Sequence, residues 1–172
     1  MPLPYSIQVA TDGIISFSTT NNVVYKALFV GIPSVEEPQL EGLIFDFTFE
    51  RDAAACLSPA HPGPNARIRP TVEQILSRFF EQAPDGIIYF SCDSTDGRQR
   101  ERQRIFNNWY AAHQRVVTQI PFWIPGGTDD TSQPLPDIIG GILFLKSHPL
   151  HALVESFIGS EILVYTSAKL HE

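Results

Sequence analysis

The sequence GIIYFSCD, residues 86–93, is a nearly continuous apolar run in the middle of the chain. A short run with so little polar alternation is typical of a strand that is buried on both of its faces. Such strands lie inside a sheet, where parallel pairing and covering helices hide them from water. The run therefore predicts the central strand of the fold.

The segments before this strand predict a second strand and a helix. LIFDFTFE, residues 43–50, alternates apolar and mostly polar side chains, as a half-buried strand does. PTVEQILSRFFEQ, residues 70–82, carries apolar residues at helical spacing. Its start has two readings: Pro70 occupies the first turn, or Thr71 caps the helix with Gln74 closing a capping box. The order strand, helix, strand predicts that 43–50 and 86–93 form a parallel central pair.

The remaining segments complete an α+β fold. Residues 5–32 predict a meander of strands, and residues 116–125 and 137–146 predict two long strands of one hairpin, with a bulge at Gly140 and Gly141. Residues 149–169 predict a C-terminal helical segment. The expected architecture is a single domain, residues 1–172, with a mostly antiparallel twisted sheet of six or seven strands and packed helices.

Composition limits the class of protein. The 172 residues carry a formal net charge of -7, and no apolar run approaches the roughly 20 residues that a membrane-spanning helix needs. The N-terminus lacks the basic and apolar regions of a signal peptide, so we expect a cytoplasmic protein with Cys56 and Cys92 as free thiols. The acidic balance argues against a large nucleic-acid footprint.

Four arginines stand within seven positions, 98–104, at the start of a second predicted helix. Asp96 and Gln99 have capping-box spacing, which predicts a helix start at Gly97. At about 100° per residue, the buried stripe holds Ile105, Phe106, Trp109 and Ala112.

The same helical wheel divides the arginines into two pairs. Arg100 and Arg104 face solvent, whereas Arg98 and Arg102 point toward the core. A buried guanidinium needs a carboxylate or a cleft that reaches water. Three interpretations stay open: pairing with carboxylates, an anion site for phosphate or carboxylate at the helix N-terminus, and contact with nucleic acid. The candidate carboxylates are Asp46, Asp52, Asp93 and Asp96.

Other side chains that could bind a metal or act in catalysis give weaker signals. His148 and His151 flank Pro149 without a completing ligand, so we expect helix-start residues and no metal site. Nothing local supports a Cys–His nucleophile pair or a cation site, and we expect both tryptophans in the core. The residues concerned are Cys56, His61 and Cys92 for the nucleophile, Asp129 and Asp130 for the cation, and Trp109 and Trp123 for the core.

Two resemblances follow from longer stretches. The element order of residues 43–146, with GPNARIRPT (63–71) and RIFNNWY (104–110), looks like the second half of the GNAT-superfamily N-acetyltransferases. That resemblance implies an acetyltransferase-like strand order and acyl-CoA as a cofactor. It would place Arg67 and Arg69 beside the cofactor, and Tyr110 where a tyrosine protonates the leaving thiolate.

The second resemblance extends over the whole chain. TVEQILSRFF (71–80), IIYFSCDSTDGRQRERQRIFNNWY (87–110) and KSHP (146–149) together resemble a family of small bacterial proteins of unknown function. This resemblance implies no particular chemistry.

Two functions are consistent with these patterns. The first is a non-catalytic interaction protein with a protein partner, and it is favoured because no general base with a partner can be named. The alternative is an acyl-CoA- or phosphate-binding, N-acetyltransferase-like enzyme whose cleft lies at Arg98 and Arg102. A homodimer stays open.

Overall fold

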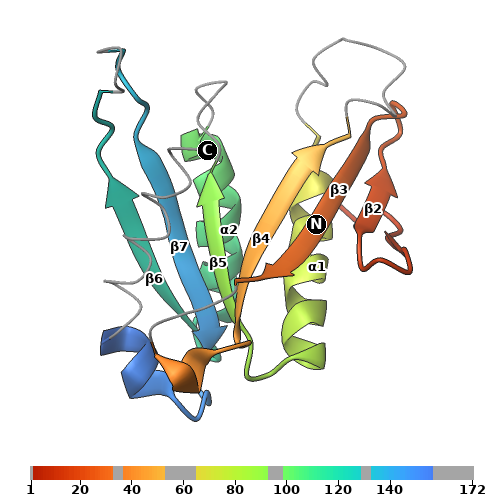
Figure 1. Cartoon of the computed structure of the whole chain (residues 1–172). Coiled ribbons are helices and arrows are strands. Elements are labelled where there is room, and N and C mark those ends of the chain that lie inside the picture. Colours follow the sequence, from red (N-terminus) through yellow and green to blue (C-terminus); the bar gives the residue numbers. More distant parts are fainter. Residues whose placement is uncertain (1, 33–36, 53–64, 93–98, 129–132, 157–172) are drawn as a thin grey trace.

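The computed structural model describes residues 2–32, 37–52, 65–92, 99–128 and 133–156. One seven-stranded sheet has the order β1-β2-β3-β4-β5-β7-β6 (Figure 1). The strands are β1 (Gln8–Val9), β2 (Ile15–Ser18), β3 (Val24–Gly31), β4 (Ile44–Arg51), β5 (Ile87–Cys92), β6 (Val117–Ile124) and β7 (Ile138–Leu145). Among these described strands, the central pair, β4 and β5, is parallel and every other pair is antiparallel. The predicted α+β fold, with a mostly antiparallel sheet, is confirmed.

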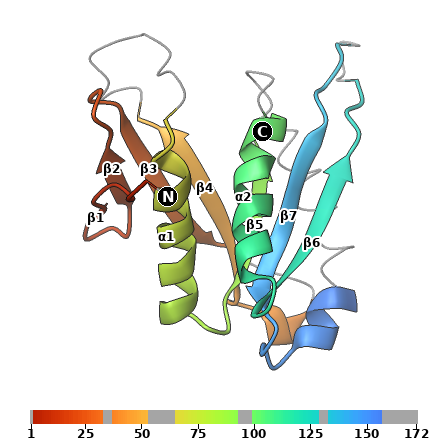
Figure 2. The ribbon, with the colours of Figure 1, turned by 180° about the vertical axis from the view of Figure 1, so that it is seen from behind.

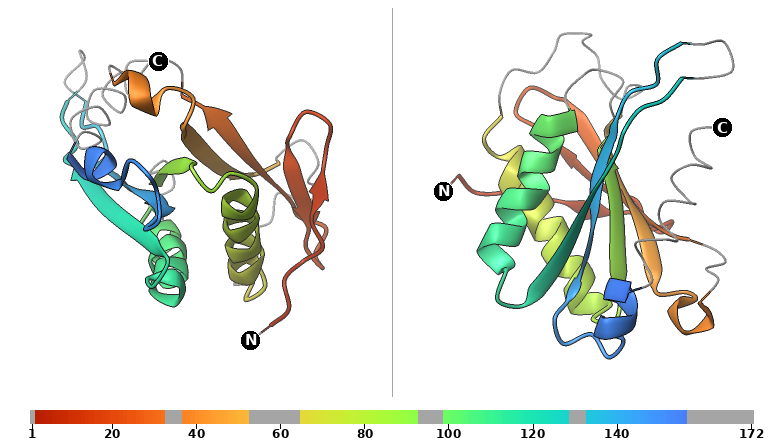
Figure 3. Two further views of the ribbon diagram at one scale, coloured as in Figure 1. Left: turned by 90° about the horizontal axis from the view of Figure 1, so that it is seen from below. Right: turned by 90° about the vertical axis from the view of Figure 1, so that its left-hand side faces the viewer.

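The two long helices cover the same face of the sheet. Helices α1 (Ile68–Gln82) and α2 (Gln99–His113) lie side by side on it, and Figure 2 shows them in front of the strands (Figures 2 and 3). A short 3-10 helix, η1 (Pro38–Leu40), and the helical turn 151–156 lie at one end of the other face. Each face has its own cluster of buried apolar side chains. No helix in the described part of the chain is long and apolar enough to cross a membrane.

Helix α1 begins at Ile68, two residues before the predicted start. Pro70 therefore lies in the first turn, as one of the two readings predicted. Thr71 does not cap the helix, so the capping-box reading is wrong. Its hydroxyl donates to the carbonyl oxygen of Arg67 at 2.7 Å and accepts from the backbone N–H of Tyr5 at 2.8 Å. The threonine thus ties the N-terminal segment to the first turns of α1.

The central strands β4 and β5 form a fork. They pair only between Ile44–Asp46 and Ile87–Tyr89, and then diverge (Figure 1). The N–H of Ile87 donates to the Leu43 carbonyl, so by alternation the main chain of Ser91 faces the fork. These strands mark where the sheet splits into two halves.

Aromatic rings fill the helix side of the fork. The Phe106 ring, from α2, stacks on Phe90 of β5 with centroids 3.8 Å apart. It also meets the ring of Phe47, from β4, edge-on at 5.9 Å. Three elements are therefore joined by apolar contact at the point where the strand ladder ends.

The glycine pair in β7 does not form the predicted bulge. Gly140 and Gly141 pair in unbroken register with β5 and β6. A Cβ at Gly140 would meet the Phe90 carbonyl oxygen and the Phe122 ring. The glycines are therefore needed for the close approach of these neighbours.

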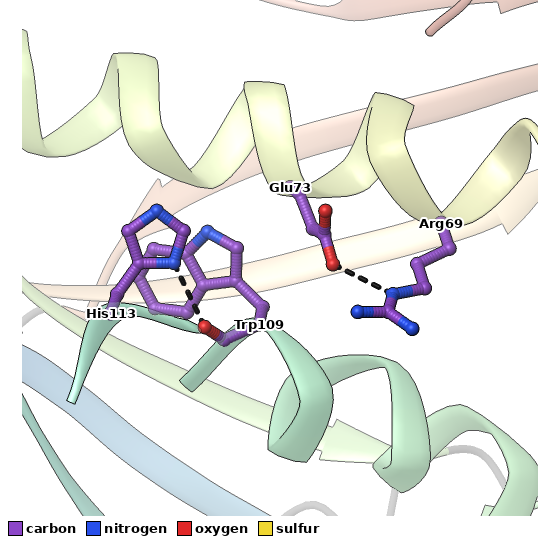
Figure 4. Close-up of polar contacts among 4 residues, drawn as sticks. All are labelled: Arg69, Glu73, Trp109 and His113. Atoms are coloured by element: carbon purple, nitrogen blue, oxygen red, sulfur yellow. Dashed lines mark hydrogen bonds and ion pairs between the residues drawn. The ribbon is translucent and has the colours of Figure 1, made fainter. Parts of the chain in front are cut away.

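Helix α2 confirms most of the predicted buried stripe. Phe106 and Trp109 are buried and Ile105 is half-buried, but Ala112 is exposed, so its prediction is wrong. His113 takes that place: its ring stacks on Trp109 at 4.7 Å, and its Nδ1 lies 2.8 Å from the Trp109 carbonyl oxygen (Figure 4).

Candidate functional site

The described arginines of α2 divide as the helical wheel predicted. Arg100 and Arg104 are exposed, whereas Arg102 is half-buried. Burial raises the pKa of the Cys92 thiol to about 12, and the positive charge of Arg102 opposes that rise. Arg102 therefore lies near the carboxyl end of β5. Arg98, the other half of the predicted anion site, lies outside the described residues, as does the predicted helix start at Gly97.

Two of the four carboxylates considered as partners, Asp46 and Asp52, lie in the described residues, on β4 and just after it. Asp52 pairs with Lys26, with Nζ and Oδ2 at 2.8 Å. Asp46 is buried on β4, on the sheet face opposite the helices, because strand residues alternate and its neighbour Phe47 packs on the helix side. Asp93 and Asp96 lie outside the described residues.

Arg67 and Arg69 contact the protein itself. The Arg67 guanidinium donates to the carbonyl oxygens of Leu3 and Pro4, at 2.8 and 2.9 Å, and lies over the Tyr5 ring. Arg69 forms an ion pair along α1 with Glu73, whose Oε1 is 2.8 Å from its Nε (Figure 4). Their role beside a cofactor stays a prediction. In this structure Arg67 binds the N-terminal segment, and Arg69 pairs with a neighbour on the surface of α1.

Tyr110 lies on a different flank of α2 from Arg102. It lines an open hollow of about 260 Å³ between α2 and β6, together with Gln103, Asn107, Gln119 and Pro121. Arg102 precedes Tyr110 by eight residues, roughly 12 Å along a helix axis. Of the described residues, Arg102 and Tyr110 therefore lie on separate flanks of α2.

The hollow is lined by neutral groups. Gln119 on β6 donates from Nε2 to Oδ1 of Asn107 on α2 at 3.0 Å. Carboxamides and a phenol both donate and accept hydrogen bonds, so they suit a neutral polar ligand such as a peptide group. We call the hollow, with Trp123 further along β6, the α2–β6 groove.

Among the described strands, β6 lies at one edge of the sheet, and its outward hydrogen-bonding groups can be assigned. The N–H of Lys146 donates to the Val116 carbonyl at 2.8 Å, so even-numbered residues of β6 bond to β7. The odd-numbered residues Val117, Gln119, Pro121 and Trp123 direct their main-chain groups away from the sheet. Proline has no N–H, and edge positions of this kind are where a strand tolerates it.

Trp123 contradicts the expected core position, because 61% of its surface is exposed. It stands near the end of β6, on the side where the sheet has no further strand in the described part of the chain. Its Nε1 donates to Oδ2 of Asp137 at 3.1 Å, and Oδ1 of Asp137 accepts from the Gly126 N–H at 2.8 Å. These two bonds, with a smaller effect of Arg100, lower the pKa of Asp137. The exposed ring is therefore fixed in place.

The histidines have structural contacts. His148 is buried, with Nε2 3.1 Å from the Asp85 carbonyl oxygen, and its Nδ1 accepts from the Leu150 N–H at 3.0 Å. His151 pairs with Glu155. Within the described ranges, no three potential ligands gather as a metal site would require. Cys56, His61, Asp129 and Asp130 lie outside those ranges.

Comparison with known proteins gives one match. Residues 64–120 match a family of unknown function (DUF6169). The match covers about a third of the 172 residues, from just before α1 to the middle of β6. It confirms the expected resemblance to a family of unknown function. The searches of curated proteins and of solved structures returned no match.

Most residues of the groove were missed by the sequence interpretation. Gln103, Asn107 and Tyr110 are spaced at i, i+4 and i+7, which places them on one helix flank. Pro121 within a predicted strand is a signal for a sheet edge. Read together, these two signals could have indicated a polar flank beside an exposed edge.

Proposed function

We propose that this protein is a non-catalytic binding protein whose partner docks in the α2–β6 groove. The observation that carries the proposal is the alignment of three features along β6: outward main-chain groups, neutral amides, and the exposed Trp123. Tryptophan is favoured at the centres of binding interfaces because it buries a large rigid surface. A fixed, exposed tryptophan beside a polar hollow suits recognition of a partner.

The lining of the hollow argues for binding without chemistry. Its side chains are two glutamines, an asparagine, a tyrosine and a proline. Among the described residues that line the hollow, no carboxylate, imidazole or amine stands beside Tyr110, so no general base with a partner can be named there. Tyr110 is therefore proposed as a contact residue in place of the predicted acid.

The fork between β4 and β5 supports a second candidate, an acyl-CoA- or phosphate-binding, N-acetyltransferase-like enzyme. The main chain of Ser91 faces the fork, and Arg102 brings a positive charge near its β5 side. Against this candidate, the rings of Phe47, Phe90 and Phe106 fill the helix side. It therefore ranks second.

Two measurements separate these candidates. A photo-crosslinking residue placed at Asn107 should give a discrete crosslinked product in cells, whereas one placed at Arg78, exposed on α1, should not. Coenzyme A and acetyl-CoA should leave the thermal midpoint unchanged. Crosslinking at both positions alike would overturn the proposed groove. A saturable thermal shift that Arg102→Ala removes would support the enzyme.

We also propose a cytoplasmic location. The Cys92 thiol is free and buried, which suits a reducing compartment. The partner is proposed to be a protein, because the net charge of -7 disfavours nucleic acid.

A further inference from the structure

We propose that the occupant of the α2–β6 groove is an acidic segment of a partner protein, which adds to the sheet as an extra strand beside β6. This inference rests on the proposed function and specifies its partner. Three features support this partner: the outward main-chain groups of β6, the charges on α2 and the position of Pro121.

The outward groups of β6 can hold an extended segment. Val117, Gln119 and Trp123 each present an N–H and a carbonyl oxygen to the open side, and Pro121 presents a carbonyl oxygen. An added strand would lie about 4.8 Å beyond β6. Every second side chain of the added strand would point to the face of the sheet that carries the helices. These side chains would lie beside the flank of α2 that lines the hollow. The hollow at Gln103 and Asn107 would receive them.

The flank of α2 beside the hollow carries positive charge, which favours an acidic segment. Arg100 and Arg104 are exposed and alternate with Gln103 and Asn107 along one side of α2. The effect of Arg100 on the pKa of Asp137 places its charge near the Trp123 end of the groove. Glutamate or aspartate at alternate positions of the added strand would therefore meet arginine side chains.

The same charges disfavour a second copy of this chain. Two β6 strands paired across a two-fold axis form one continuous sheet, which puts both α2 helices on the same face. The arginine flanks of the two helices would then face one another, and like charges repel. The groove therefore suits a different, acidic chain.

Pro121 limits how the segment pairs. A strand opposite Pro121 loses one main-chain hydrogen bond, which interrupts a long ladder. Such interruptions protect natural edge strands from aggregation. Recognition must therefore depend on side chains at the α2 flank as well as on the main chain, which gives specificity.

The test uses the full chain and a fluorescein-labelled nine-residue peptide with glutamate at alternate positions and threonine or valine between them. Anisotropy should show saturable binding. Arg104→Glu should weaken binding about tenfold. Arg78→Glu, which makes the same charge change at an exposed position of α1, should not. Raising the salt to about 1 M, where the Debye length is about 3 Å, should also weaken it.

The other possible results distinguish two claims: that a partner binds in the α2–β6 groove, and that this partner is an acidic segment added as a strand. If a peptide with lysine in place of glutamate binds equally well, the groove binds segments but the acidic class is wrong. If no peptide binds while crosslinking at Asn107 succeeds, strand addition is wrong and the binding face stands. If neither gives a signal, both proposals fail. A dimer that Arg104→Glu strengthens would identify a second copy as the occupant.

Discussion

Gln119 on β6 donates a hydrogen bond from Nε2 to Oδ1 of Asn107 on α2, at 3.0 Å. This bond joins the edge strand to the helix at the hollow itself. It uses one donor and one acceptor, so each carboxamide keeps further bonding capacity for a ligand. The pair therefore serves both the fold and the proposed binding face.

Asn107→Ala tests the second of these roles. The side-chain pair is exposed, so its loss should change the free energy of unfolding by about 1 kcal/mol or less. Peptide binding should weaken at least severalfold. Urea unfolding and anisotropy measure the two effects. Asn108→Ala, half-buried on the same helix but outside the hollow, is the control, and equal weakening by both variants would count against the groove.

Phe106→Ala tests the aromatic closure of the fork. The ring is buried against Phe90 and Phe47, so its removal should cost roughly 3–5 kcal/mol of unfolding free energy. Phe106→Leu, which keeps much of the volume, should cost less. Urea denaturation measures both values. A loss below about 1 kcal/mol for the alanine variant would show that the rings do not hold the two strands.

Gly140→Ala tests the close approach in β7. The added methyl group would meet the Phe90 carbonyl oxygen and the Phe122 ring, so overpacking should destabilise the protein by about 1–3 kcal/mol. Gly127→Ala is the control, because nothing lies within 4 Å of a Cβ there. Thermal or urea unfolding of both variants makes the comparison, and equal stability would refute the steric reading.

The Cys92 thiol predicts a loss of stability in alkali. Its pKa is raised from 9.0 to about 12 in the folded state, so the unfolded state ionises first. Stability from this group is full below pH 9.0 and falls between pH 9.0 and about 12. The slope for one group is roughly 1.4 kcal/mol per pH unit. Cys92→Ala should lack this component, and parallel pH curves for the two proteins would contradict the assignment.

The sequence predicted the sheet well because its signals are local and strong. The apolar run of β5 and the alternation in β4 fixed the central pair, and helical spacing fixed α1 and α2. These patterns reflect which side chains are buried, and burial is extensive at the centre of the sheet. The inward direction of Arg102 followed from the same periodicity.

The site was harder to predict because it depends on the sheet edge. Which strand lies outermost follows from pairing order, and neither the order nor the hydrogen-bonding phase is local in sequence. Trp123 was therefore assigned to the core by its residue type alone. The two flanks of α2, with Arg102 on one and Tyr110 on the other, became separate sites only once β6 was placed.

Amide hydrogen exchange along β6 tests the central claim most directly. In the free protein, the N–H groups of Val117, Gln119 and Trp123 should exchange faster than those of Thr118, Ile120 and Phe122, which bond to β7. With the acidic peptide at saturation, protection should rise at Gln119 and Trp123. Peptide binding that leaves the exchange of both amides unchanged would contradict strand addition at this edge.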